Sequence, residues 1–224
     1  MKGKLYIVAT PIGNKDDITI RAVSTLNQVD IIAAEDTRVA SKLLSLLKIS
    51  KKQLISINEF ATDKNIKHCI DILNEGKDIA YVSDAGSPGI SDPGAVLVKA
   101  CRDDDIEIIP IPGVSAITTL ISVSGIRETP FMFYGFLPHK KGRQKILGEL
   151  LKTDTNIVLY ESVHRFVKLL EEIININPEQ FIVVGRELTK MYEDIKADNA
   201  KNILDFYVNN PSKVKGEFVI IIKK

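Results

Sequence analysis

The chain has 224 residues, of which 45% are hydrophobic, so it can bury one large core or two small ones. Charged residues make up 26%, and 30 Lys+Arg stand against 29 Asp+Glu, which gives a formal net charge of +1. This balance excludes a disordered polyelectrolyte. It also lacks the overall basic character that many nucleic-acid-binding domains carry.

Membrane, disulfide and metal-site classes are not expected either. The sequence has no run of about 18 apolar residues, and its first apolar run is broken by Pro11 and Gly13, which indicates a buried strand instead of a signal peptide. Cys69 and Cys101 lie far apart, and the three histidines show no ligand spacing. We therefore expect reduced thiols, no metal, no membrane partner and a cytoplasmic location.

Short apolar runs alternate with amphipathic segments in the first half of the chain. Strands are predicted over residues 5–9, 30–34, 53–57, 79–83 and 106–109, and helices over 18–26, 37–47, 63–74 and 93–103. This alternation is typical of βαβ units with a largely parallel sheet. Asp92, directly before Pro93, is predicted to cap the last of these helices.

The pattern changes after Pro112–Gly113, where we place a boundary between lobes 1–112 and 113–224. A helix is predicted near 115–122, followed by strands at 131–136, 155–160, 181–185 and 218–222. Helices near 143–151, 163–174 and 200–208 separate most of these strands. Each lobe is near the usual size of a domain.

Three loops that follow predicted strands carry the clearest signs of a ligand site. The nucleotide motifs GxxxxGK[ST] and GxGxxG are absent, so a P-loop enzyme is not expected. Instead, residues 10–14 read TPIGN, residues 84–94 read DAGSPGISDPG, and residues 110–116 read PIPGVSA. The second loop has acids and glycines but no Lys or Arg, which suits a cationic or hydroxyl-bearing ligand better than a triphosphate. Because ligands bind at the carboxyl ends of strands in open α/β sheets, we predict one composite site.

Charged residues also follow strands elsewhere in the chain, at EDTR (35–38), YESVHR (160–165) and RELTKMYE (186–193). Such clusters make structural ion pairs about as often as they mark a site. Residues 138–145 read PHKKGRQK, with four basic residues and no acid. A run of this kind is more often a solvated loop than a phosphate clamp, but it is the best local candidate for contacting a polyanion.

Several motifs occur together in one order. They are TPIGN (10–14), EDTR (35–38), SDAGSPGISDPG (83–94), PGVSA (112–116), YGFLP (134–138), YES.HR (160–165), RELTK..E (186–193) and GE (216–217). Together they resemble the ribosomal RNA 2′-O-methyltransferase branch of the tetrapyrrole methylase family, and the resemblance covers nearly the whole chain. EDTR, YES.HR and RELTK set this branch apart from relatives that act on corrinoids or diphthamide.

The resemblance implies two α/β lobes, each with a mostly parallel sheet flanked by helices and the second sheet mixed, with S-adenosylmethionine in the cleft between them. The methyl acceptor would be the ribose 2′-hydroxyl of a cytidine in the decoding centre of 16S ribosomal RNA, within the small ribosomal subunit. The enzyme would be a homodimer without a metal.

The resemblance also implies roles for individual residues. Cofactor contacts would be made by Pro11, Asp84, Ala85, Gly86, Ile90, Ser115, Ala116, Tyr160 and Leu188. For the chemistry we predict Glu161, Arg186, Glu187 and Lys190, and for RNA contacts Arg38, Lys140, Lys141, Arg143 and Arg165. Lys190 can serve as a general base only if burial or Arg186 lowers its pKa; otherwise it orients phosphate, and Glu161 or Glu187 is the better base.

Two departures from the family pattern and two alternative functions remain. The usual His-Asn-Glu stretch is replaced by Phe60-Ala61-Thr62, and we expect no helical C-terminal extension after the strand at 218–222. The alternatives are a methyltransferase acting on a tetrapyrrole or diphthamide precursor, and a non-catalytic ribosome-assembly factor.

Overall fold

The computed structural model describes residues 1–58, 63–127 and 130–224. The substitution predicted at Phe60-Ala61-Thr62 therefore lies outside the described residues. The chain divides into two compact units, an N-terminal unit (Met1–Ser115) and a C-terminal unit (Ala116–Lys224). The division falls three residues after the boundary expected from the sequence.

The N-terminal unit is a parallel sheet with helices on both faces. Its strands are β1 (Leu5–Val8), β2 (Ile31–Ala34), β3 (Gln53–Ser56), β4 (Ile79–Val82) and β5 (Ile108–Ile111), in the order β3-β2-β4-β1-β5. Its helices are the 3-10 helix η1 (Lys15–Asp17) and the α-helices α1 (Ile20–Gln28), α2 (Thr37–Leu46), α3 (Asp63–Asn74) and α4 (Gly94–Asp103). All strand pairs are parallel, so the carboxyl ends of the strands meet at one edge.

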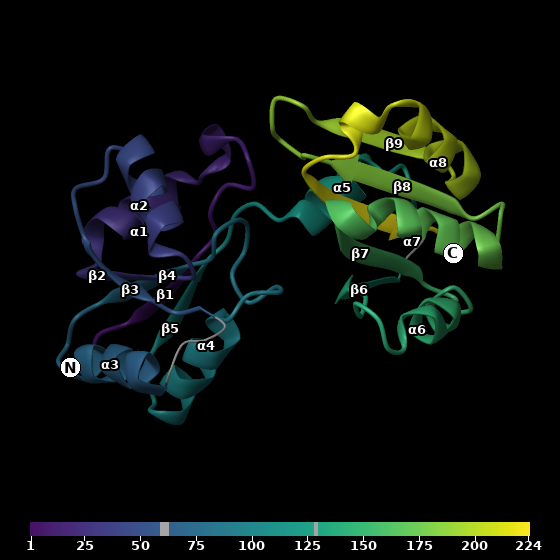
Figure 1. Cartoon of the computed structure of the whole chain (residues 1–224). Helices are drawn as coiled ribbons and strands as arrows, with labels where there is room; N and C mark the ends of the chain where they lie inside the picture. Colours follow the sequence, from purple (N-terminus) through teal and green to yellow (C-terminus); the bar gives the residue numbers. More distant parts are fainter. Residues whose placement is uncertain (59–62, 128–129) are drawn as a thin grey trace. The chain divides into compact units, whose positions relative to one another are not determined.

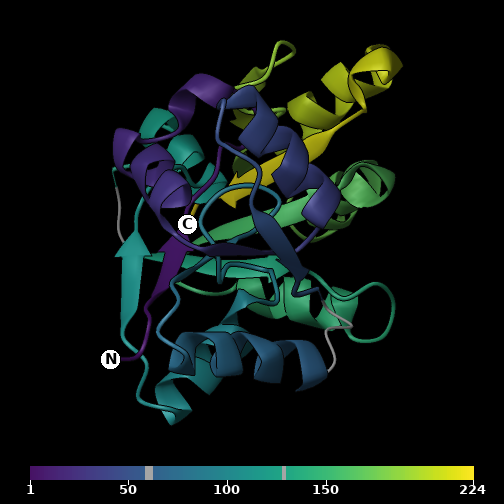
Figure 2. The ribbon, with the colours of Figure 1, turned by 90° about the vertical axis from the view of Figure 1, so that its left-hand side faces the viewer.

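Two apolar clusters cover the two faces of this sheet. One joins the sheet to α1 and α2, and the other joins it to α3 and α4 (Figure 1). Every residue of the central strands β2 and β4 is buried, as expected for strands covered on both sides. Figure 2 shows β1 beside β5, with α3 along one side of the sheet.

The C-terminal unit has a mixed sheet. Its strands are β6 (Phe131–Phe136), β7 (Asn156–Ser162), β8 (Phe181–Arg186), β9 (Asp194–Asn199) and β10 (Glu217–Ile222), in the order β6-β7-β10-β8-β9. Its helices are α5 (Ala116–Val123), α6 (Arg143–Leu150), α7 (Val163–Ile176) and α8 (Ala200–Asn209), with the 3-10 helix η2 (Pro211–Lys213). Among the strands that the structure describes here, β6 and β7 pair in parallel, and β7 with β10, β10 with β8 and β8 with β9 pair antiparallel.

The two faces of the C-terminal sheet pack against different helices. Val184 belongs to the large apolar cluster formed with α6, α7 and α8. Its neighbour Gly185 faces Leu120 of α5, since a Cβ on Gly185 would lie 2.8 Å from Leu120 Cδ1. Successive residues of a strand point to opposite faces, so α5 covers the face opposite to α7 and α8.

Strand β9 was not predicted from the sequence, and neither were the two short 3-10 helices η1 and η2. Its residues, Asp-Ile-Lys-Ala-Asp-Asn, contain no apolar run of the kind on which the strand predictions depend. The strand forms because it pairs along its length with β8 at the edge of the sheet.

Among the described residues, no helix combines the length and apolar character needed to cross a bilayer.

Candidate active site

The loops after β1 and β4 are joined at the carboxyl edge of the N-terminal sheet. Thr10 N donates to Gly86 O at 2.9 Å, and Gly86 N donates to Thr10 O at 3.0 Å. Gly86 has a φ of +80°, and a Cβ there would lie 3.3 Å from Ile12 Cγ2. A side chain at this position would be strained and crowded, so the junction of the two loops requires glycine.

Asp84 links the loops after β2 and β4. Its Oδ1 accepts a hydrogen bond from the Asp36 amide at 3.0 Å, and its own amide donates to Glu35 Oε2 at 3.2 Å. Partial desolvation raises the pKa of Asp84, whereas the hydrogen bonds from Arg38 hold the pKa of Asp36 at about 2. The two loops therefore form one connected acidic edge, in which Asp36 also caps α2 through the Arg38 amide at 2.8 Å.

Asp92 holds the glycine-rich loop against α4. Its Oδ2 accepts from the amides of Gly89 at 2.6 Å and Ile90 at 2.9 Å, and its Oδ1 accepts from Gly94 N at 2.8 Å. The buried Tyr81 hydroxyl donates to the same Oδ1 at 3.2 Å. Helix α4 begins one residue later than predicted, and Asp92 still satisfies an amide of its first turn, as a capping residue does.

The loop after β5 packs on the other two loops. Ser87 Oγ donates to Val114 O at 3.0 Å, and a Cβ on Gly113 would lie 2.9 Å from Ala9 Cβ. Close approach of these loops therefore requires the small residue at 113. The structure brings one part of the predicted cofactor set to this edge, namely Pro11, Asp84, Ala85, Gly86, Ile90 and Ser115.

The remaining predicted cofactor residues lie on the α5 face of the C-terminal sheet. Tyr160, Val219 and Gly185 pair across three strands and so form one row on this face. Leu188 is buried and packs on Gly185, where a Cβ would lie 2.9 Å from its Cδ2. Ala116 is the first residue of α5. Burial raises the pKa of Tyr160 to about 12, so its hydroxyl stays protonated at neutral pH.

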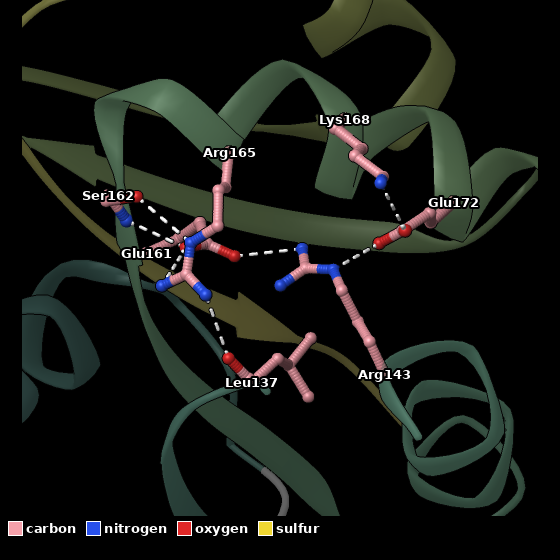
Figure 3. A network of polar contacts seen from close by, with 7 residues as sticks. All are labelled: Leu137, Arg143, Glu161, Ser162, Arg165, Lys168 and Glu172. Atoms are coloured by element: carbon pink, nitrogen blue, oxygen red, sulfur yellow. Dashed lines mark hydrogen bonds and ion pairs between the residues drawn. The ribbon is translucent and has the colours of Figure 1, made fainter. Parts of the chain in front are cut away.

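A buried ion network occupies the opposite side of the same strand (Figure 3). Arg143 donates from Nε to Glu172 Oε2 at 2.7 Å and from Nη2 to Glu161 Oε2 at 2.9 Å. Glu161 Oε1 accepts from Arg165 at 2.8 Å and from the Ser162 amide at 2.8 Å. Burial lowers the pKa of Arg143, but its hydrogen bonds to the two glutamates outweigh this effect and raise the pKa overall.

This network contains residues for which the sequence predicted other roles. Arg143 was expected to contact RNA, but it is 2% exposed and its guanidinium lies between two carboxylates. Glu161 was a candidate base, but it is 2% exposed and both of its oxygens accept hydrogen bonds. Its carboxylate thus connects Arg143, Arg165 and the Ser162 amide. Arg165, also predicted to contact RNA, is tied to Glu161, Ser162 Oγ and Leu137 O.

The turn between β8 and β9 brings the other predicted catalytic residues together. Lys190 Nζ lies 2.9 Å from both Glu187 Oε1 and Glu217 Oε2. Burial lowers the pKa of Lys190, but the two carboxylates outweigh burial and raise it overall. Arg186 is 7% exposed and donates from Nη2 to Tyr192 O at 2.7 Å. Lys190 is therefore an ammonium ion at neutral pH, and the condition for its use as a base is not met.

Glu187 is the remaining candidate base of this turn. Burial raises its pKa, but Lys190 and the Glu217 amide outweigh burial and lower it overall. Its Oε1 accepts from both of these groups at 2.9 Å. A carboxylate with a lowered pKa is a weak base, so this arrangement favours charge placement over proton removal.

The basic run separates into exposed and buried parts. Lys140, Lys141 and Lys145 are exposed, whereas Arg143 is buried. A cavity of about 430 Å³ is lined there by His139, Lys140, Gly142, Arg143, Gln144, Lys145, Lys168 and Glu172. Arg38, on the other unit, has a side chain that is 89% exposed, although it pairs with Asp36. The solvent-facing positive charge expected of the loop is thus carried by its lysines.

Sequence reasoning missed the partners of these charged residues. Glu172 and Glu217 each complete an ion network, yet neither was predicted to have a role. Glu172 had one visible signal, because it falls among Leu169, Leu170 and Ile173 on the buried face of α7. An acid on an apolar helix face requires a buried partner.

The cysteines and histidines form no reactive centre that the structure shows. Within the described ranges, no group of three or more His, Cys, Asp or Glu side chains is placed to hold a metal ion. Cys69 and Cys101 are buried free thiols, and burial raises the pKa of each to about 12. Protonated, buried thiols are poor nucleophiles and poor metal ligands.

Comparison with known proteins defines the class of the chain. The family of tetrapyrrole (corrin/porphyrin) methylases matches residues 4–204, so the chain belongs to this family. Among solved structures, a cobalt precorrin-4 methyltransferase superposes with a TM-score of 0.72 at 21% identity, covering 98% of this chain and 94% of that one. The predicted fold class is therefore confirmed.

Curated proteins are similar to the chain over nearly its whole length. The chain is 46% identical over 221 residues to ribosomal RNA small subunit methyltransferase I of Borrelia garinii subsp. bavariensis, covering 98% of both chains. It is 42% identical over 220 residues to the protein of the same name from Thermotoga maritima, again covering 98% of both. The predicted resemblance is confirmed, and the chain is a methyltransferase.

One solved structure of the same fold contains a form of the predicted cofactor. Uroporphyrin-III C-methyltransferase from Thermus thermophilus, with a TM-score of 0.66 at 13% identity, was solved with S-adenosyl homocysteine; it covers 98% of this chain and 97% of that one. S-adenosyl homocysteine is the demethylated form of S-adenosylmethionine. A solved structure with the same fold thus holds the demethylated form of the cofactor that the sequence predicts for this chain.

Proposed function

We propose that the chain transfers a methyl group from S-adenosylmethionine to the ribose 2′-hydroxyl of a cytidine in the decoding centre of 16S ribosomal RNA. The observation that carries this proposal is the similarity, over nearly the whole chain, to proteins named ribosomal RNA small subunit methyltransferase I. We further propose that the protein acts on the small ribosomal subunit in the cytoplasm, as a homodimer.

The residues of the N-terminal edge fit the proposed cofactor. Asp84 offers a carboxylate to an ammonium or a ribose hydroxyl, and it lies in a loop segment without Lys or Arg. Gly89 has open space around its Cβ position, so a ligand can approach the loop backbone closely there. We propose that Pro11, Asp84, Ala85, Gly86, Ile90 and Ser115 hold the cofactor, together with Ala116, Tyr160 and Leu188.

S-adenosylmethionine supplies an activated methyl group on a sulfonium, so alignment of the acceptor is the main task left to the protein. We propose that Lys190 and Arg186 place positive charge beside the acceptor, and that Glu187 and Glu217 orient Lys190. We propose that Glu161 acts indirectly, because it holds Arg165 and the Ser162 amide at the start of α7 in place. For RNA contacts we propose Arg38, Lys140 and Lys141, with Arg143 in a structural role.

Transfer of a radiolabelled methyl group tests the proposed reaction. We expect label from S-adenosylmethionine to enter small ribosomal subunits prepared from a strain that lacks the gene. Mass spectrometry should place it on the ribose of one cytidine. Label on a tetrapyrrole or on diphthamide precursor, with none on RNA, would replace the proposal by the corresponding alternative. Cofactor binding without transfer to any of these would favour an assembly factor.

Replacing Asp84 with asparagine should weaken cofactor binding by about 10- to 100-fold, since a hydrogen bond to a charged group contributes about 1.5–3 kcal/mol. Calorimetric titration with S-adenosylmethionine measures the change. The matched control is Asp71→Asn, at an exposed position of α3, which should bind as the wild type does. Equal affinities for all three proteins would remove Asp84 from the cofactor site.

Substitutions at Lys190 separate a positioning cation from a general base. Because its pKa is raised, the group stays protonated from pH 6 to 9, and the activity should not follow its titration in this window. Lys190→Met should lower kcat about tenfold or more, with the cofactor affinity unchanged. Lys190→Arg, which keeps the charge but cannot accept a proton, should retain most of the activity. If Lys190→Arg is as slow as Lys190→Met, the positioning role is refuted.

A further inference from the structure

An irregularity in β6 turns an aromatic side chain toward Tyr160. Residues 133 and 136 are three apart, so a regular strand would place them on opposite faces. The pairing of β6 with β7 shifts register between Phe133 and Gly135, and Gly135 has a φ of +82°. The extra residue brings both rings to the same face. Their centroids lie 5.0 Å and 5.6 Å from that of Tyr160.

Phe136 is the open end of this aromatic cluster. It remains 49% exposed, whereas Phe133 and Tyr160 on the same face are partly buried. Arg165 Cζ lies 6.0 Å from the centroid of the Phe136 ring. The guanidinium is held in place by Glu161 and by Leu137 O at 3.0 Å (Figure 3). The exposed Phe136 ring thus packs against Tyr160 and has the fixed guanidinium of Arg165 beside it.

The segment of the chain that follows this ring is basic. Phe136 lies two residues before the basic run at 138–145, in which there is no Asp or Glu. The exposed Lys140 and Lys141 lie four and five residues after the ring, and Lys140 also lines the cavity described above, between this loop, α6 and α7. An aromatic face beside an arginine and exposed lysines matches the two parts of a nucleotide, because bases stack on aromatic rings and phosphates attract lysine.

We propose that Phe136 is a stacking platform for an unpaired base of the RNA substrate, with Arg165 at its edge and Lys140 and Lys141 on the adjoining phosphates. The proposal rests on the proposed RNA methylation, and it names a residue that fixes the position of the acceptor strand. It also explains why a large apolar ring stays exposed next to a basic loop.

Fluorescence tests the contact directly, because the chain has no tryptophan. Phe136→Trp introduces a single reporter, and we expect its emission to be quenched in a saturable way by a single-stranded RNA oligonucleotide with the decoding-centre sequence. The quenching should weaken as salt rises. Val208→Trp, on α8 at a position that is 61% exposed, is the matched control and should not respond. Equal responses, or none, from the two variants would overturn the proposal.

Steady-state kinetics separate this proposal from the proposed function. Phe136→Leu should raise the KM for small ribosomal subunits about 5- to 100-fold, with the affinity for S-adenosylmethionine unchanged. Phe136→Tyr, which keeps an aromatic ring, should have a KM close to that of the wild type. If the wild type methylates RNA and Phe136→Leu keeps the wild-type KM, the platform is refuted and the function stands. If the wild type transfers no methyl to RNA, and the oligonucleotide leaves the Phe136→Trp emission unchanged, both fail.

Discussion

Replacing Arg143 with methionine is expected to lower the free energy of unfolding by about 3–5 kcal/mol, since it leaves buried carboxylates without their partner. Arg143 contacts Glu172 at 2.7 Å and Glu161 at 2.9 Å, and the side chains of these three residues are between 1% and 9% exposed. Methionine has a similar volume, so the loss comes from charge and not from a cavity. Urea titration followed by circular dichroism measures it.

Two further variants identify the source of this loss. Lys145→Met removes a charge that is 81% exposed and 3.9 Å from Glu149, so it should cost less than about 0.5 kcal/mol. In the Arg143→Met background, Glu161 keeps Arg165, whereas Glu172 keeps only Lys168 at 4.0 Å among the pairs that the structure shows. Adding Glu172→Gln should therefore restore a substantial part of the stability. The burial argument fails if Arg143→Met costs no more than Lys145→Met.

Arg143 also shows where sequence reasoning reaches its limit. Within the run PHKKGRQK, all four basic residues have the same local signature. They differ only through partners that lie far along the chain, because Glu161 and Glu172 come 18 and 29 residues later. The sequence could predict a basic loop, but the assignment of one arginine to the core required the packing of α6 against α7.

The protonation state of Lys190 also depends on a partner that lies far along the chain. The motif RELTK predicts that Arg186, Glu187 and Lys190 lie together, and a neighbouring arginine alone would lower the pKa of the lysine. The pKa is raised by Glu187 within the motif and by a second carboxylate, Glu217, which is 27 residues away and reaches Lys190 because β10 pairs with β8. The local partner Glu187 was visible in the motif, whereas the contribution of Glu217 depends on strand pairing, which local patterns do not encode.

The sequence predicted the fold more completely than the candidate site. Buried strands such as β2 and β4 have only apolar residues, so their sequence identifies them without knowledge of their neighbours. Strand β9 is polar and depends on β8 for its structure, so it was missed. The loops after β1, β4 and β5 were predicted to meet because parallel strands end at one edge, and Thr10 and Gly86 do contact each other there.

Replacing Gly94 with alanine is expected to destabilise the N-terminal unit by about 1–3 kcal/mol, the usual cost of overfilling a packed site. A Cβ at this position would lie 2.4 Å from Tyr81 Cε1 and 2.8 Å from Asp92 Oδ1. Tyr81 is fully buried in the core cluster and its hydroxyl donates to Asp92, so the ring has no free space to move into. Displacing Asp92 would also release the amides of Gly89 and Ile90, which loosens the proposed cofactor loop.

The matched control should change stability in the opposite direction. Gly148 lies inside α6, and nothing lies within 4 Å of its Cβ position. Alanine there should raise the free energy of unfolding by about 0.5–1 kcal/mol, because glycine loses more backbone entropy on folding. The same substitution in two helices thus tests packing against propensity, with urea titration of both variants as the measurement. If Gly94→Ala is also stabilising, the contact between α4 and Tyr81 is not as close as the structure shows.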